Sequence, residues 1–292
     1  MGGRGGKGGA GPGTGAKNKK AAGAGTSSGA AGGGGSSAGS SGSGGKGTGS
    51  AGTGGVTGGG GSGGSAGGGS STSTQQPKAL AIQYGEGLTE AEKAKQQKMF
   101  DKLPDHLKKR LFDSGTKIWV GTRADKTPGW AEFAKETGYD SNSKIADGRE
   151  IGSLSFYLGS RNELFISVHH PGGSVNVYTH ELGHALDYQM IGGTKLREWP
   201  PGSGDFRTVR IISDDPEWAE IHAKEIVNNQ NINSYYRGGP SGKDPVSGRK
   251  ELFAEGFAVY NEYGRSALVG WVKSEKVADT MIDIWKRYGV IK

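Results

Sequence analysis

The chain has 292 residues, no cysteine and a formal net charge of +7. The absence of cysteine excludes disulfide frameworks and zinc sites built on thiolates. No apolar run reaches the roughly 18 residues that a membrane-spanning helix needs, and no apolar signal core opens the chain, so we expect neither a membrane span nor Sec export. A cytoplasmic protein, a virion-associated protein and a delivered toxin all remain compatible with these features.

Residues 1–77 differ in composition from the rest of the chain. They hold 34 of the 58 glycines and contain no Asp, Glu, Phe, Trp or Tyr. Such a segment buries too little apolar area to offset its conformational entropy, so we expect a disordered, basic Gly/Ser/Ala tail that serves as a tether. It carries 6 of the 36 basic residues, which leaves 30 basic against 29 acidic residues in the remainder. Because the basic charge belongs to the tail, we expect no stable nucleic-acid partner for the folded part.

Residues 78–292 are long enough for one substantial domain. A capping box, Thr89 with Glu92 three residues later, starts a helix over 88–100. Further along, the sequence predicts a short helix at 108–111, a strand at 117–121, a helix at 130–137 and a hairpin with strands at 151–158 and 163–168. We expect Leu164 to Val168 to form an edge strand, where an extended polypeptide substrate adds to the sheet.

The second half of the domain is expected to be mainly helical. Apolar residues recur at helical intervals in three segments, at 215–226, 250–260 and 274–288. In the first of these, Glu217, Glu220 and Glu225 are expected on the charged face of the helix. The sequence therefore predicts an α+β domain, mainly helical and with a small sheet.

The run His180-Glu181-Leu-Gly-His184 lies in one apolar-rich helical segment. Side chains four residues apart project from the same face of a helix, so both imidazoles reach a single Zn²⁺ ion. Glu181 lies roughly 100° around the helix, where it acts as general base on a zinc-bound water. Gly183 costs about 1 kcal/mol of helix propensity, which indicates that another segment packs closely there. Asp187 falls on the histidine face and either orients a ligand histidine or is an ordinary exposed aspartate.

A catalytic zinc usually takes three protein ligands. Met190 stands where a metzincin has its third histidine, and the other histidines, expected on the surface or in loops, have no metal spacing to the motif: His106, His169, His170 and His222. Glu251 and Glu255 stand four apart on a mostly apolar helix, where an unpaired charge is prohibitive. We therefore expect Glu251 to be the third ligand and Glu255 to fix the tautomer of a ligand histidine.

Residues 180–187, 215–221 and 251–258 together resemble the catalytic domain of the anthrax lethal-factor-like metallopeptidases, a gluzincin family. The resemblance covers roughly residues 145–265 and implies a zincin-like fold and zinc-dependent hydrolysis of peptide bonds. By this resemblance His180, His184 and Glu251 bind Zn²⁺ and Glu181 is the catalytic base. It also implies a tyrosine that stabilises the oxyanion, for which the candidates are Tyr236 and Tyr235, although both lie farther from the third ligand than the family pattern requires.

Two other functions stay open at this point. One is a non-catalytic zinc-binding structural or assembly component displayed on the Gly-rich tail, and the other is a nucleic-acid binder driven by that tail. Glu181 argues against the first, because a purely structural zinc site has no need of a base.

Overall fold

The computed structural model describes residues 79–292, so the expected tail at 1–77 lies outside the described residues. A four-stranded sheet forms the first half, in the order β1 (Ile82–Tyr84), β2 (Lys117–Gly121), β4 (Glu163–Ser167) and β3 (Phe156–Leu158). The first three strands are parallel, and β3 runs antiparallel to β4. The strand at 117–121 and the hairpin are confirmed, but the hairpin's first strand is shorter than expected because Ile151–Ser153 form a 3₁₀ helix.

The strand β4 lies inside the sheet, so the expectation that Leu164 to Val168 form an edge is wrong. Leu164 pairs with Ile118 of β2 on one side and with Tyr157 of β3 on the other. All five residues of β4 are buried. Backbone groups on both sides of β4 are thus already used, and a substrate strand cannot add there. The outer strand on this side of the sheet is β3.

Three helices accompany the sheet: α1 (Glu90–Asp101), α2 (Asp105–Asp113) and α3 (Trp130–Thr137). The capping box of α1 is confirmed, because the Glu92 amide donates to the Thr89 hydroxyl at 3.2 Å and the Thr89 amide donates to the Glu92 carboxylate at 2.8 Å. Side chains alternate across the sheet. Val120 therefore joins a core with α1 and α2, whereas Phe165 packs with Phe133 of α3 in a second cluster.

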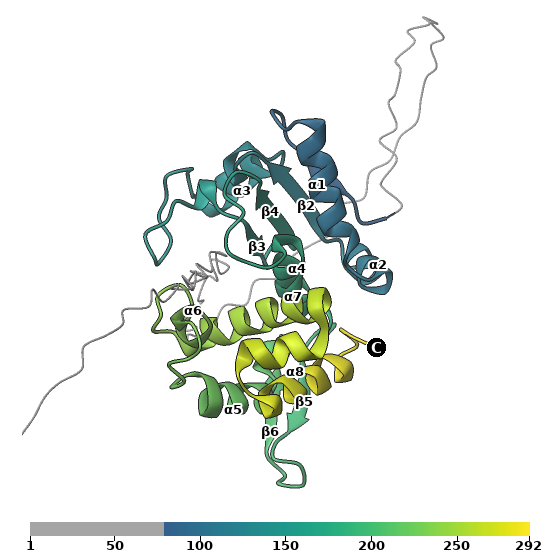
Figure 1. The fold of residues 1–292 in the computed structure, drawn as a ribbon, viewed down its shortest axis with the longest axis vertical. Coiled ribbons are helices and arrows are strands. Elements are labelled where there is room, and N and C mark those ends of the chain that lie inside the picture. Colours follow the sequence, from purple (N-terminus) through teal and green to yellow (C-terminus); the bar gives the residue numbers. More distant parts are fainter. Residues whose placement is uncertain (1–78) are drawn as a thin grey trace, which may run out of the picture.

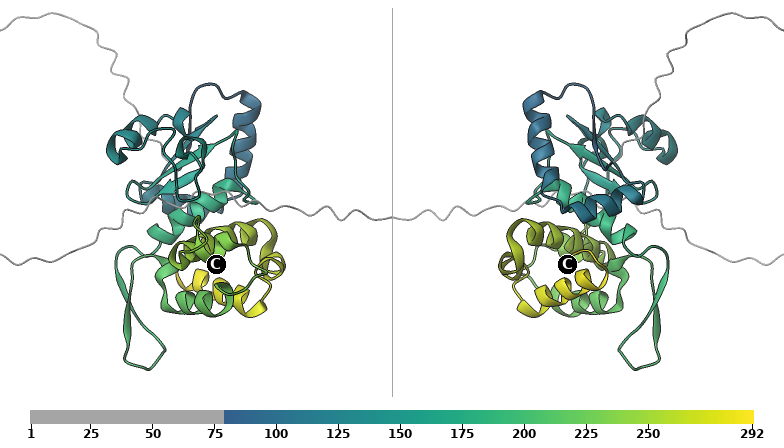
Figure 2. Two further views of the ribbon diagram at one scale, coloured as in Figure 1. Left: turned by 90° about the vertical axis from the view of Figure 1, so that its left-hand side faces the viewer. Right: turned by 90° about the vertical axis from the view of Figure 1, so that its right-hand side faces the viewer.

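The remainder is mainly helical, with one further hairpin. Its elements are α4 (Val177–Gln189), the hairpin β5 (Lys195–Glu198) and β6 (Phe206–Val209), α5 (Pro216–Ile221) continued by a π-helix (His222–Ile226), α6 (Ser234–Gly238), α7 (Pro245–Val272) and α8 (Glu275–Arg287). The sheet with α1 to α3 lies above in Figure 1, α5 and α8 lie below, and α4 and α7 meet between them. Figure 2 shows the β5–β6 hairpin projecting from the helical part. The described chain is an α+β, mainly helical structure, and none of its helices has the length and apolar character to span a bilayer.

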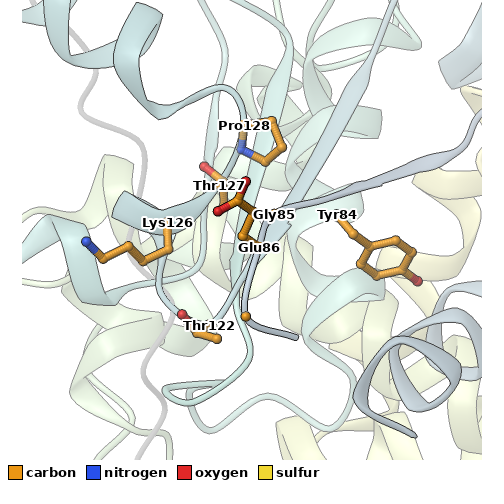
Figure 3. Close-up of a pocket in the computed structure, with 8 residues that line it drawn as sticks. Tyr84, Gly85, Glu86, Thr122, Lys126, Thr127 and Pro128 are labelled. Atoms are coloured by element: carbon orange, nitrogen blue, oxygen red, sulfur yellow. The ribbon is translucent and has the colours of Figure 1, made fainter. Parts of the chain in front are cut away.

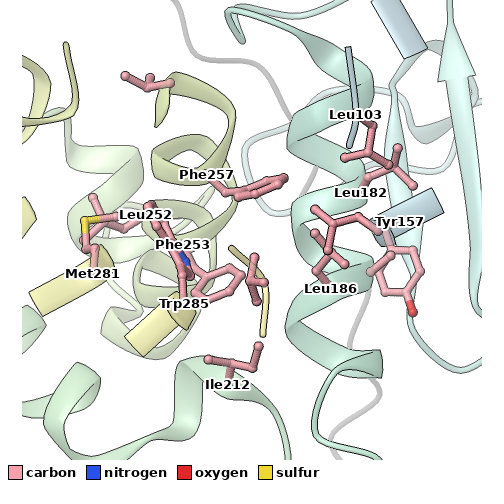
Figure 4. Close-up of a cluster of buried hydrophobic side chains, with 14 of the residues drawn as sticks. Leu103, Tyr157, Leu182, Leu186, Ile212, Leu252, Phe253, Phe257, Met281 and Trp285 are labelled. Atoms are coloured by element: carbon pink, nitrogen blue, oxygen red, sulfur yellow. The ribbon is translucent and has the colours of Figure 1, made fainter. Parts of the chain in front are cut away.

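Helix α4 packs against α7, and Gly183 permits their close approach. A Cβ atom on Gly183 would lie 2.9 Å from the Cα atom and 3.1 Å from the carbonyl oxygen of Ala254. The expected close packing at this glycine is thereby confirmed. Figure 4 shows apolar side chains of α4, Leu182 and Leu186, near Phe257 of α7 in the shared core. The two helices that carry the motif residues are thus held in contact along their lengths.

Candidate metal centre

The histidine pair of α4 is positioned by a cap at the start of the helix. The side-chain oxygen of Asn176 accepts hydrogen bonds from the amides of Tyr178 and Thr179, at 3.1 and 3.3 Å. One turn further on, the imidazole rings of His180 and His184 are buried, with their centroids 5.0 Å apart. Together with Glu181, these histidines form a group that could hold a metal ion. Asn176 was not singled out from the sequence, although an asparagine directly before a helix is a common cap.

Helix α7 brings a second carboxylate to the same point. One oxygen of Glu251, Oε2, lies 3.4 Å from His180 Nε2 and 3.3 Å from His184 Nε2. Ligand atoms 2.0–2.2 Å from a tetrahedral zinc ion are about 3.3–3.5 Å from one another. The buried Nε2 atom of His184 makes no hydrogen bond of normal geometry within residues 79–292. Both the spacing and this unsatisfied nitrogen fit a zinc ion held by these three side chains.

Two carboxylates adjoin the histidines, and their geometries differ. Glu181 belongs to the group whose ligand atoms lie within 4.8 Å of one another. Glu251 comes closer, because a single oxygen atom meets both imidazole nitrogens at distances of 3.3 and 3.4 Å. The distances therefore favour Glu251 as the third ligand and leave Glu181 beside the site.

Glu255, one turn after Glu251, contacts the other nitrogen of the first histidine. His180 Nδ1 lies 2.7 Å from Glu255 Oε2, and because an ionised carboxylate only accepts hydrogen bonds, the imidazole is the donor. The second oxygen of Glu255 accepts a hydrogen bond from the Val175 amide at 3.2 Å. With its proton on Nδ1, His180 directs Nε2 to Glu251, as expected for a supporting carboxylate.

The charges of this cluster alter its protonation. Burial alone lowers the pKa of His180, but its hydrogen bonds to Glu251 and Glu255 outweigh burial and raise the pKa to about 10. Burial raises the pKa of Glu181 to about 8, although His180 acts in the opposite direction. Burial also raises the pKa of Glu251, but the two histidines outweigh it and bring the pKa to about 2. The amide of Tyr157 in β3 lowers the pKa of Glu181 slightly, yet neither oxygen of Glu181 makes a hydrogen bond of normal geometry among the described residues.

Asp187 is fully buried, so its interpretation as an ordinary exposed aspartate is wrong. Its Oδ1 accepts a hydrogen bond from the Ser213 amide at 2.6 Å, and its Oδ2 accepts one from the Ser213 hydroxyl at 2.7 Å. Burial raises the pKa of Asp187 to about 6, against the opposing effects of Ser213 and of the nearby His184. His184 is thus close enough to affect the pKa of Asp187, and a role of the aspartate in orienting that histidine stays a prediction. The sequence gives no signal for Ser213, a partner 26 residues away.

The two candidate tyrosines lie next to each other on α6 in different surroundings. Burial and the charges of Glu255 and Glu251 raise the pKa of Tyr236. Tyr235 instead interacts with the guanidinium of Arg149. The structure thus brings Tyr236 near the carboxylates of the candidate site.

The charged residues of α5 lie away from this centre. Glu217 pairs with Arg197 at 2.7 Å, and Glu220 accepts a hydrogen bond from the indole nitrogen of Trp199 at 2.6 Å. Among the described residues, the carboxylate within 3.4 Å of both His180 and His184 belongs to Glu251 and not to either of these glutamates. The contacts with Arg197 and Trp199 agree with the expectation that Glu217 and Glu220 lie on the charged face of their helix.

His222 is buried, which corrects its expected place on the surface or in a loop. Its side chain is 2% exposed, and its Nε2 atom lies 2.9 Å from the carbonyl oxygen of Tyr236. Trp218 stands one turn earlier on the same face and is also buried. The sequence signal for the burial of His222 was its position four residues after the apolar Trp218, on the same face of the helix.

The structure contains a cavity of about 440 Å³ beside Glu255 and a larger one elsewhere. The first is lined by Tyr236, Glu255 and Trp271, among others. The larger cavity, of about 750 Å³, lies where β1 and β2 end, with Tyr84 and Lys126 on opposite sides in Figure 3. Neither cavity has an imidazole among the described residues that line it.

No protein-family model and no curated protein matches the chain. Among solved structures, the chain is similar to the Pro-Pro endopeptidase PPEP-2 from Paenibacillus alvei, with 18% sequence identity and a TM-score of 0.47, over 70% of this chain and 96% of that one. This likeness is remote, and the assignment of function rests on the geometry of the residues around His180 and His184.

Proposed function

We propose that the chain is a zinc-dependent metalloendopeptidase with a zincin-like fold of the gluzincin type. The observation that carries the proposal is the convergence of His180, His184 and Glu251 at ligand spacing, with Glu181 buried beside them. The motif segments that resemble the lethal-factor-like family support the same function. The chemistry of the site residues and the order of the motifs along the chain both favour this reaction class.

In this proposal His180, His184 and Glu251 hold the metal, and three protein ligands leave a fourth position for water. Zinc, when bound, lowers the pKa of that water and polarises the scissile carbonyl. Glu255 keeps the proton on Nδ1 of His180 and so keeps Nε2 available as a ligand atom.

Glu181 is the proposed general base. It accepts the proton of the attacking water and later delivers it to the leaving amine, a role typically worth ~10²–10⁴ in rate. Its oxygens make no hydrogen bond of normal geometry to other described residues, and the nearby Tyr157 amide lowers its pKa by less than burial raises it. Tyr236 is the proposed donor to the oxyanion, because it lies near Glu251 and Glu255 whereas Tyr235 interacts with Arg149.

The proposed substrate is an extended polypeptide that adds as a strand along β3. The three residues of β3 are buried, as those of β4 are, but this strand lies at the end of the sheet and, among the described strands, pairs with β4 alone. Its Tyr157 amide is near enough to Glu181 to affect the pKa of that carboxyl. An added strand would hydrogen bond to the backbone of β3 and lie beside the general base. The proposed position of the substrate strand, along β3, replaces the position that the sequence predicted at Leu164 to Val168.

A structural zinc protein is the main competing function. It explains the three ligands but gives no role to a buried carboxylate that makes no normal hydrogen bond in the described part of the chain. The test is to profile cleavage of a peptide library by the zinc-loaded protein, by the protein treated with a chelator, and by Glu181→Gln. A peptidase cleaves defined bonds only in the first case, whereas a structural zinc protein cleaves in none.

A further inference from the structure

We propose that the cavity of about 440 Å³ beside Glu255 is a specificity pocket for a substrate side chain with an apolar stem and a carboxylate end, namely glutamate. The inference rests on the proposed peptidase function and adds a substrate class to it. We assign the pocket to a substrate residue close to the scissile bond, because the cavity is lined by Tyr236, the proposed oxyanion donor, and by Glu255, which contacts His180.

The inner walls of the pocket are apolar and aromatic. The rings of Tyr236 and Trp271 meet edge to face, with centroids 4.9 Å apart, and Ile232 and Leu252 add aliphatic surface. Such walls favour the methylene groups of a long side chain over a short polar one. The stem of the substrate side chain is thus selected by apolar contact.

The one carboxylate in the lining, Glu255, is already engaged. Its Oε2 contacts His180 Nδ1 at 2.7 Å and its Oε1 accepts a hydrogen bond from the Val175 amide at 3.2 Å. Both oxygens therefore have donors, and Glu255 does not require a basic side chain from the substrate.

The charge available to a substrate is that of Lys273. This residue lines the cavity and is exposed, and it forms no ion pair with any acidic residue in 79–292. Its backbone, with φ of 59°, is in the left-handed conformation that ends α7, a position where glycine is the usual residue. The lysine thus lines the pocket at a position where helix geometry would favour glycine. An acidic side chain bound in the pocket would form an ion pair with it.

The test compares kcat/KM for peptides that differ only in having Glu, Gln or Lys next to the scissile bond, placed on either side in turn. The protein should prefer Glu over Gln on one side by on the order of tenfold, because a hydrogen bond to a charged group contributes that much. Lys273→Gly removes the ammonium group while suiting the left-handed backbone, so it should keep the fold and zinc but lose the preference. Lys273→Arg should retain the preference, and Lys273→Glu should shift it to Lys. The matched control is Lys95→Glu, an exposed lysine of α1.

A second variant tests the volume of the pocket independently of charge. A Cβ atom on Gly270, which also lines the cavity, would meet no atom within 4 Å. Gly270→Leu should therefore add bulk without a clash, and it should slow cleavage of the Glu peptide more than cleavage of the matched Ala peptide.

The outcomes separate the two proposals. If Lys273→Gly retains the ratio of Glu to Gln cleavage seen before the change, the pocket assignment is wrong and the peptidase remains. If the zinc-loaded protein cleaves no peptide of the library, the peptidase function itself is wrong, and the pocket assignment is overturned with it.

Discussion

Gly183 and Ala254 bring the two helices that carry the proposed metal ligands together at their backbones, because a Cβ atom on Gly183 would lie 2.9 Å from the Cα atom of Ala254. On α4, Gly183 directly precedes His184, and on α7, Ala254 directly precedes Glu255. The contact therefore sets the distance between the histidine pair and the two carboxylates that face it.

Gly183→Ala should lower the free energy of unfolding and weaken zinc binding. The change adds about 1 kcal/mol of helix propensity, but overpacking against a backbone typically costs 1–3 kcal/mol, so we expect a net loss of up to about 2 kcal/mol. Urea unfolding with and without zinc measures both effects. The matched control, Gly270→Ala on α7, meets no atom within 4 Å and should be neutral or stabilising. Equal stability and zinc affinity in the two variants would show that the helices do not depend on this close contact.

Glu251→Ala should reduce bound zinc from about one ion per chain to nearly none, because three ligands leave no redundancy. His180→Ala and His184→Ala should do the same. Metal analysis of the purified variants measures the content directly. Glu217→Ala is the matched control, since Glu217 pairs with Arg197 away from the site. Full zinc content in Glu251→Ala, with loss in Glu217→Ala, would reverse the assignment of the third ligand.

Without zinc, the protein should lose stability as the pH rises from 6.5 to about 10. The pKa of His180 rises from 6.5 to about 10 on folding, so its contribution is complete below pH 6.5 and is lost as the pH passes through the folded value. Zinc requires the neutral imidazole, so the zinc-loaded protein should lack this loss, and zinc affinity should increase with pH. Thermal unfolding in chelator and in zinc, at several pH values, measures the difference.

Glu255→Gln provides the control for this pH dependence. Because Glu255 is one of the three carboxylates that raise the pKa of His180, the variant should narrow the pH window in which the metal-free protein loses stability. Parallel pH curves for metal-free and zinc-loaded protein would contradict a charged His180 in the absence of metal.

Tyr236→Phe should keep the zinc and lower kcat by ~10²–10³, since it removes one oxyanion donor and leaves the base intact. Tyr235→Phe should have a smaller effect on turnover, because Tyr235 interacts with Arg149. Turnover of a single library-derived peptide, with metal content checked, measures both. A larger loss for Tyr235→Phe would transfer the oxyanion role to that residue.

Local patterns in the sequence predict the parts of the fold that depend on neighbouring residues. The capping box at Thr89 and the spacing of His180 and His184 can each be recognised from residues that lie about one helical turn apart. Glu251 is also predictable, because a carboxylate on an apolar helix needs a partner of opposite charge. The helices and the presence of a close neighbour at Gly183 follow from such patterns, but the identity of that neighbour, α7, does not.

Features that depend on distant pairing were not predictable. The interior position of β4 requires β2 on one side, and β2 in turn pairs with β1, a strand of three residues. The hydrogen bonds between Asp187 and Ser213 likewise join different elements through the tertiary fold. A periodic pattern shows which face of a strand or helix is buried, but it does not identify the neighbouring element.

The most direct test of the proposed function is turnover by Glu181→Gln with its zinc content measured in the same sample. Glutamine is nearly isosteric, and Glu181 is not a proposed ligand, so the variant should keep its fold and about one zinc per chain. It cannot accept a proton from water, so cleavage of a peptide that the unmodified protein hydrolyses should fall by at least ~10²-fold. Undiminished cleavage by the zinc-loaded variant would contradict the assignment of Glu181 as the general base and with it the proposed mechanism.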